Sequence, residues 1–148
     1  MALFDHETFA RRFANAMSDH DQDATKLLMT EDFVAEWPQT GERVRGAANF
    51  WAIIDNYPGR VPGGDDLTTL VTRPGAAMKL LAPAYTFVAV EGAGSTGTFT
   101  LKVKYPDNSD WWVITLYRLR GDRLSHCTTF FAPVLPSPEW RAQWVERM

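Results

Sequence analysis

The sequence is poor in cysteine, in basic charge and in long apolar runs. One cysteine among 148 residues excludes an internal disulfide, which suits a reducing compartment. The 15 basic residues are outnumbered by 18 acidic ones, for a net charge of −3. A domain that neutralises nucleic-acid phosphates normally carries a basic excess. The longest mostly apolar stretch, residues 80–90, contains Pro83 and Thr86 and is shorter than the about 20 residues that span a bilayer. We therefore expect no nucleic-acid partner and no membrane partner.

The length and the lack of linkers indicate a single domain over residues 1–148. A chain of 148 residues falls within the range of about 100–200 residues that is usual for one domain. The proline- and glycine-rich residues 57–66 form a loop that is too short to separate two domains. The opening MALFDHETF has neither the positive cluster nor the apolar core of a signal peptide. We expect a cytoplasmic protein.

The hydrophobic pattern places helices before strands. Phe9, Phe13 and Met17 recur at helical spacing after Asp5, a typical capping residue. A short second helix is expected to carry Leu27 and Leu28, and a third to begin near Gly46 and end before Pro58-Gly59. A last helix is expected after Ser137, which has the features of an N-cap. Strands are expected at residues 33–37, 67–73, 84–91, 98–105, 111–120 and 123–131. This segregation predicts an α+β fold with an antiparallel meander.

A glycine-rich segment, GAGSTG, matches the dinucleotide-binding pattern at Gly92, Gly94 and Gly97. Such a site needs a helix after the glycines, because the pyrophosphate binds at the helix N-terminus. The residues that follow, TFTLKVKY, alternate as a strand does. We therefore interpret the segment as a hairpin connection and expect no cofactor.

Three acidic residues at alternating positions match part of the pattern of a calcium-binding loop. Asp19, Asp21 and Asp23 have the right spacing, but Ala24 and Thr30 stand where a calcium loop needs glycine and glutamate. We interpret the segment as a solvated turn that caps a helix.

The histidines and the cysteine do not predict a metal site either. His6 and His20 would lie roughly 21 Å apart along a continuous helix. His126 and Cys127 are adjacent on a strand, so they point to opposite faces and share neither a metal nor a catalytic hydrogen bond. We expect no metal, with Cys127 as a small core residue and His126 as an outer-face or interface group.

The strand at residues 111–120 is apolar on both faces. Trp112, Ile114 and Leu116 form one face, and Trp111, Val113, Thr115, Tyr117 and Leu119 the other. Helices of the chain can cover one face, and the other needs a second cover. We expect a homodimer through Trp112, Ile114 and Leu116; the alternative is that the C-terminal helix folds back over them.

The order of elements resembles the nuclear transport factor 2-like superfamily, in particular its SnoaL-like branch of polyketide cyclases and relatives. The resemblance covers nearly the whole chain. Its parts are the F-x-x-x-F first helix, the segment DFVAEWPQTGERVRGAANFW, and the G-D-R-L hairpin with its strand ending in FFAP. It implies a curved sheet wrapped around helices into a cone with an interior pocket, often in a dimer. It does not fix the function, because this fold carries many activities.

The ketosteroid isomerase branch of that superfamily uses ionisable groups inside the cone. By alignment, its general base falls on Trp37 and its oxyanion-hole acid on Thr115. Its oxyanion-hole tyrosine falls on Phe13 and a supporting tyrosine on Ile54. These residues have no ionisable group, and a general base alone contributes roughly 10²–10⁴-fold in rate. The sequence therefore argues against that isomerisation. The Asp-Arg-Asp set of an epoxide hydrolase and the inward histidines of a dehydratase are not found either.

Strand parity within this resemblance predicts an apolar pocket without a proton carrier. We expect it to be lined by Phe13, Phe33, Ala35, Trp37, Ile54, Val113, Thr115, Tyr117, Cys127, Thr129 and Phe131. The first hypothesis is binding of a small hydrophobic molecule. The second is an isomerase, cyclase or hydrolase that uses Tyr117, or uses Glu36 or Asp32 if the strand register differs by one. The third is a non-catalytic association domain with a filled core.

Overall fold

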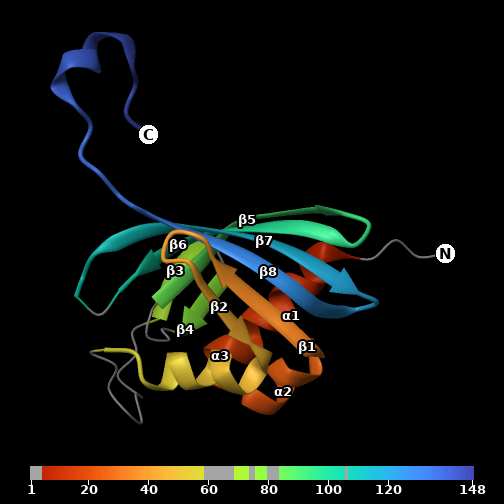
Figure 1. Cartoon of the computed structure of the whole chain (residues 1–148). Helices are drawn as coiled ribbons and strands as arrows, with labels where there is room; N and C mark the ends of the chain where they lie inside the picture. The colour runs from red at the N-terminus through yellow and green to blue at the C-terminus, as the bar shows by residue number, and fades with distance from the viewer. Residues whose placement is uncertain (1–4, 59–68, 74–75, 80–83, 106) are drawn as a thin grey trace.

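Six strands form one curved, open sheet, and three helices cover one of its faces (Figure 1). The structure is a computed structural model that describes residues 5–58, 69–73, 76–79, 84–105 and 107–148. We call the helix-covered face of this sheet the inner face and the opposite one the outer face. The arrangement is α+β, as predicted from the sequence.

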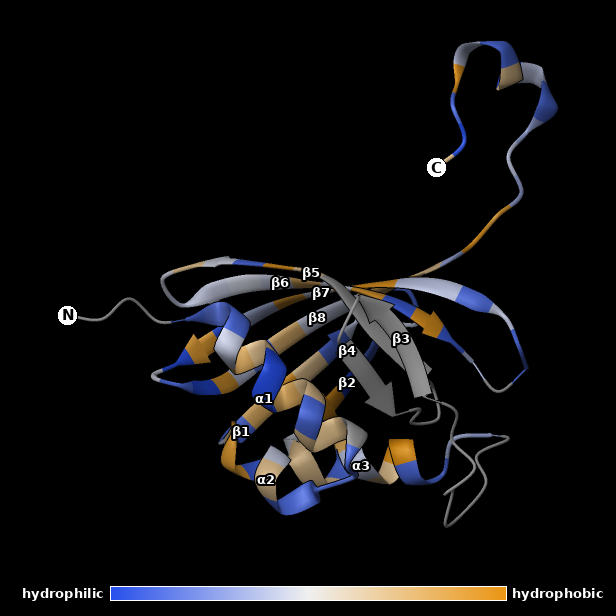
Figure 2. Ribbon diagram, turned by 180° about the vertical axis from the view of Figure 1, so that it is seen from behind, coloured by the Kyte–Doolittle hydropathy of each residue, from blue (hydrophilic) through white to orange (hydrophobic). Residues whose placement is uncertain are grey.

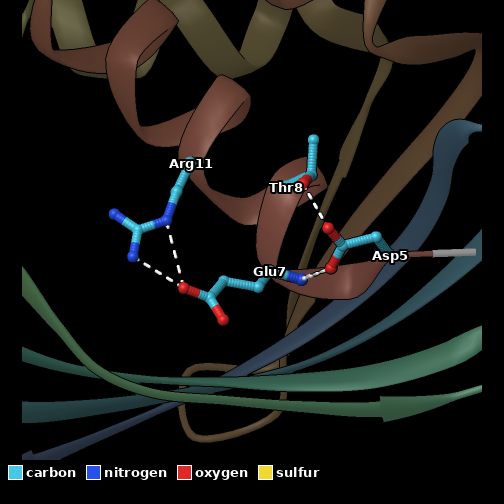
Figure 3. Close-up of polar contacts among 4 residues, drawn as sticks. All are labelled: Asp5, Glu7, Thr8 and Arg11. Atoms are coloured by element: carbon cyan, nitrogen blue, oxygen red, sulfur yellow. Dashed lines mark hydrogen bonds and ion pairs between the residues drawn. The ribbon is translucent and has the colours of Figure 1, made fainter.

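Helices α1 and α2 open the described part of the chain, and α3 follows the first two strands. Their bounds are α1 (His6–Ser18), α2 (Gln22–Leu27) and α3 (Gly46–Asp55). Asp5 caps α1 by accepting hydrogen bonds from the backbone N–H of Glu7 and the hydroxyl of Thr8, and Glu7 pairs with Arg11 one turn on (Figure 3). Asp21 caps α2 by accepting from the N–H of Ala24 at 2.9 Å, which confirms the acidic turn as a helix cap.

The order of strands across the main sheet is β2-β1-β8-β7-β6-β5. Its members are β1 (Met29–Trp37), β2 (Glu42–Arg45), β5 (Ala84–Ala93), β6 (Thr96–Lys104), β7 (Asp110–Arg120) and β8 (Arg123–Pro133). Strands β5 to β8 are the predicted antiparallel meander, and β1 lies parallel to β8. Strands β3 (Thr69–Arg73) and β4 (Ala76–Lys79) pair separately.

The predicted tight turns occur where glycine permits a left-handed backbone. Gly94 has φ +59° in the β5–β6 turn, and Gly121 has φ +65° between β7 and β8. GAGSTG is therefore a hairpin connection, as expected. Most of the proline- and glycine-rich loop, from residue 59 onward, lies outside the described residues.

The core lies between the inner face and the helices in two adjoining clusters. The first is built around Phe9, Phe33 and Tyr117, and the second around Trp51, Val103 and Val113. Phe13, Phe50 and Leu101 pack against both clusters and stay half-buried.

Two short strands and the chain end differ from the sequence predictions. Strand β2 has four residues with Val44 as its one buried side chain, and β4 is equally short, so neither offers an alternation that predicts a strand. The C-terminal helix is the six-residue 3₁₀ helix η1 (Glu139–Trp144), with Pro138 rather than Ser137 at its N-cap. A short helix without tertiary packing does not sustain α-helical geometry, and every residue of η1 is exposed.

Within the described ranges, none of the helices combines the length and the apolarity that a membrane crossing requires.

Candidate functional site

The inner face presents three successive rows of cross-strand neighbours. The rows are Leu101–Val113–Phe131, Phe99–Thr115–Thr129 and Gly97–Tyr117–Cys127–Ala35. Because side chains alternate along a strand, every member of these rows faces the helices. The middle row is the polar one, and apolar or glycine positions flank it on both sides.

The residues predicted to line a pocket divide into a deep layer and a shallow layer. Phe33, Ala35, Val113, Tyr117, Cys127 and Thr129 are buried, whereas Phe13, Trp37, Ile54, Thr115 and Phe131 are half-buried. The deep members are packed core. The half-buried members are the ones that still present surface.

Aromatic side chains connect the shallow layer. The ring of Trp37 meets the ring of Phe131 edge to face, with 6.3 Å between centroids, and Phe33 contacts Phe50 in the same way at 6.0 Å. Phe13 stacks near Phe99 at 6.4 Å. Strands β1 and β8 and helices α1 and α3 thus each contribute to a partly accessible aromatic surface.

The polar feature of this surface is a pair of threonine hydroxyls. The Oγ1 atoms of Thr115 and Thr129 lie 2.9 Å apart. Each hydroxyl can donate one hydrogen bond and accept two, so their mutual bond leaves lone pairs free to accept from a ligand. Thr115 is half-buried and is the more accessible of the two.

Cys127 and His126 lie on opposite faces, as predicted. Cys127 belongs to the core, and burial raises the pKa of its thiol to about 12. A thiol with that pKa is not a nucleophile at neutral pH. His126 faces outward, where its Nε2 lies 3.1 Å from a carboxylate oxygen of Glu36.

One ionisable side chain on the inner face is absent from the sequence prediction. His6, at the start of α1, is buried; its Nδ1 lies 2.6 Å from the Tyr117 hydroxyl and its Nε2 3.1 Å from the carbonyl oxygen of Gly94. A carbonyl only accepts, so Nε2 carries a hydrogen, and in the neutral ring Nδ1 accepts from Tyr117. The expectation that no proton-carrying residue faces inward is therefore wrong at His6. The signal was present, because His6, Phe9 and Phe13 share one helical face.

Close packing surrounds this His6–Tyr117 pair. The Tyr117 ring stacks on Phe99 with 4.2 Å between centroids, and a Cβ added to Gly97 would lie 2.2 Å from its hydroxyl. Burial raises the pKa of Tyr117 to about 12. The pair ties α1 to β7, and the bond to Gly94 ties it to the β5–β6 turn. This close packing favours a structural role over proton transfer to a substrate.

The two carboxylates considered as catalytic alternatives do not face inward. Glu36 accepts from Arg43 at 2.8 Å on the outer face, and Asp32 accepts from Arg120 at 2.9 Å in an exposed pair. The hydrogen bond from Arg43 lowers the pKa of Glu36. The strand register is therefore the one expected, and neither carboxylate belongs to the inner face.

The described part of the chain holds no group of three or more His, Cys, Asp or Glu side chains arranged to bind a metal ion.

Comparison with known proteins identifies structures of the same fold. No family model and no curated protein matches the sequence. Among solved structures, an NTF-2-like protein of unknown function from Burkholderia xenovorans superposes with a TM-score of 0.72 at 20% identity, over 96% of this chain and 94% of that one. A candidate ketosteroid isomerase from Kribbella flavida gives 0.71 at 19% identity, over 95% and 87%.

A third structure carries the name of the branch that the sequence resembles. A SnoaL-like protein of unknown function from Burkholderia thailandensis superposes with a TM-score of 0.56 at 12% identity, over 86% of this chain and 94% of that one. Likeness at these identities establishes architecture and leaves function open. The predicted resemblance is thus confirmed at the level of the fold: the chain has the fold of the nuclear transport factor 2-like superfamily, which it shares with SnoaL-like and ketosteroid isomerase-like proteins.

Proposed function

We propose that the protein binds a small, neutral, hydrophobic molecule against the inner face. The observation that carries the proposal is the combination of half-buried aromatic side chains with the Thr115–Thr129 hydroxyl pair in their midst. Ligand sites are mostly apolar, with a few polar groups that fix orientation. The half-buried lining residues described above include no charged side chain, so a neutral ligand fits this surface better than a charged one.

The chemistry of the lining supports binding more than catalysis. Proton transfer needs a group whose pKa lies near the working pH and which can reach the substrate. Burial holds the pKa values of Tyr117 and Cys127 near 12, and Asp32 and Glu36 lie elsewhere. Catalysis by an isomerase or cyclase mechanism would thus depend on His6, and the close packing around His6 keeps a substrate from it.

The expected affinity is modest. Burying about 200 Å² of apolar ligand surface at ~25 cal/mol/Å² contributes roughly 5 kcal/mol before association costs. A hydrogen bond to Thr115 adds about 1 kcal/mol. Together these contributions reach about 6 kcal/mol, which corresponds to a dissociation constant of about 40 µM before association costs, so we expect values from tens of micromolar to millimolar.

The test uses a panel of uncharged polycyclic ketones and alcohols, with their sulfonated analogues as charged counterparts. We expect neutral compounds to raise the melting temperature and to bind saturably in calorimetric titration, and sulfonates to bind more weakly. Two adjacent isoleucines of α3 offer a matched pair, because Ile54 is half-buried in the lining whereas Ile53 is 41% exposed. Ile54→Ala should weaken binding about tenfold, and Ile53→Ala should leave it unchanged.

Other outcomes discriminate between the hypotheses. Saturable binding with turnover of a conjugated or β,γ-unsaturated ketone, abolished by His6→Gln, would replace the binding proposal with an enzymatic one. A panel in which no compound shifts the melting temperature would contradict both and favour a filled core.

A further inference from the structure

The chain ends in a segment whose large apolar side chains are exposed to solvent. We call residues 134–148 the C-terminal arm. All of them are exposed except Pro138, which is intermediate. Leu135, Trp140 and Trp144 are each more than 70% exposed. Figures 1 and 2 both show the arm rising on the side of the sheet away from the helices.

Prolines direct the arm away from the sheet on which it begins. The N–H of Val134 donates to the carbonyl of Asp110 at 2.9 Å, which continues the direction of β8 past Pro133. Pro136 and Pro138 fix their own φ angles, and each disfavours helical backbone in the residue before it. Pro138 itself is extended, at φ −67° and ψ 136°. A segment of this kind resists the tight reversal needed to lay the indoles on its own sheet.

The outer face offers apolar surface that matches the arm. Ile114, Leu116 and Phe130 are 39%, 48% and 41% exposed. Ile114 and Phe130 are cross-strand partners, and Leu116 follows two residues on along β7, so these side chains adjoin on one face. Trp112 extends the same face toward the end at which the arm begins.

We propose that the C-terminal arm of each copy docks on the outer face of a second copy, so that two chains exchange arms in a symmetric dimer. A two-fold dimer makes each contact twice, and exchange of a terminal segment is a low-cost route to one. The exchange provides a cover for two exposed apolar surfaces at once. It develops the expected homodimer through Trp112, Ile114 and Leu116, in place of the alternative that the C-terminal segment folds back on its own sheet.

The dimensions and the area suit this arrangement. Five extended residues and a six-residue 3₁₀ helix reach roughly 28 Å, against about 37 Å for the eleven residues of β7. Two indoles with Leu135 and Val134 bring about 500 Å² of apolar surface to each docking. Ile114, Leu116 and Phe130 are each less than half exposed and add about 250 Å², so two dockings bury about 1,500 Å², which lies within the range of stable interfaces.

The test measures the oligomeric state of full-length variants by sedimentation velocity over a range of concentrations. The wild type should be a dimer. The arm variant Trp140→Ser/Trp144→Ser and the face variant Ile114→Lys/Leu116→Lys should each weaken dimerisation at least 100-fold. Leu27→Ser is the matched control, because Leu27 is 70% exposed on α2, and it should leave the dimer intact. Circular dichroism and melting temperature show that each variant is folded.

Mixing the variants distinguishes exchange from other dimers. A heterodimer of the arm variant with the face variant retains one intact arm against one intact face, so the mixture should recover dimer that neither variant forms alone. A monomeric wild type would overturn the proposal. So would an arm variant that dimerises like the wild type, or a mixture that recovers no dimer.

Discussion

Gly97 lies directly against Tyr117. A Cβ added to Gly97 would be 2.2 Å from both Cζ and the hydroxyl oxygen of Tyr117, which is closer than real Cβ contacts come. Its cross-strand partner Gly92 stands in the same relation to His6, because a Cβ added there would lie 2.5 Å from the imidazole ring. Two glycines on adjacent strands thus form the surface on which the His6 and Tyr117 rings pack. Absence of a side chain is what this position requires, because no left-handed backbone is involved at either glycine.

Gly97→Ala should destabilise the protein by about 2–3 kcal/mol, because a methyl group forced into a packed site displaces the aromatic ring. Chemical denaturation at neutral pH measures the loss. In a Tyr117→Leu background the same substitution should cost clearly less, since the rigid ring has gone. If Gly97→Ala cost the same stability in both backgrounds, the close contact between Gly97 and the Tyr117 ring would not be the cause of the loss.

Tyr117→Phe should cost about 1–2 kcal/mol, because it removes the hydroxyl that lies 2.6 Å from Nδ1 of His6 and leaves that buried nitrogen without this partner. His6→Ala should cost more, since it also removes the ring that packs on Gly92. A double-mutant cycle should give a coupling of about 1 kcal/mol. Additive losses would mean that the hydrogen bond contributes nothing.

The sequence predicts those parts of the fold that depend on alternation and caps. Asp5 before Phe9 and Phe13 predicted α1, and alternation along residues 111–120 predicted both β7 and its inner set, with Thr115 and Tyr117 facing the helices. Cys127 and His126 fell on opposite faces as expected. These features follow from local periodicity, which a single sequence displays directly.

The role of His6 and the course of the chain end depend on distant residues. His6 and Tyr117 are 111 residues apart in the sequence. The helical face on which His6 lies could therefore be predicted, whereas its contact with Tyr117 could not. Gly92 and Gly97 were interpreted through their turn, whereas their close approach to α1 appears only once the helix is placed. The terminal helix carried good capping signals, yet its residues are all exposed and none of the described segments covers it, so the 3₁₀ form replaced the expected α-helix.

Alkaline pH should destabilise the wild type more steeply than Tyr117→Phe. Burial raises the pKa of Tyr117 from 10.0 to about 12 in the folded state. The unfolded chain therefore loses this proton first, and stability that is fully present below pH 10 falls as pH rises toward 12. The slope is at most about 1.4 kcal/mol per pH unit.

Denaturation midpoints at pH 9, 10 and 11 measure this slope. Tyr105 and Cys127, whose pKa values burial also raises to about 12, titrate in both proteins, so the difference between the two profiles isolates Tyr117. Thr115→Val, which removes no ionisable group, should follow the wild-type slope. Parallel profiles for the wild type and Tyr117→Phe would contradict the assignment.

The two threonines of the inner face allow stability and ligand binding to be separated. Thr129→Val alone should cost about 1 kcal/mol, because it takes a hydrogen-bond partner from Thr115. Replacing both threonines by valine keeps the shape and removes both polar groups together, so the double variant should be nearly as stable as the wild type. Its affinity for a neutral polycyclic ketone or alcohol should nevertheless fall about fivefold to tenfold, since the ligand loses its polar partner and keeps its apolar contacts. A double variant that is strongly destabilised would mean that the hydroxyl pair serves the fold, and unchanged affinity in a stable double variant would remove the threonines from the binding site.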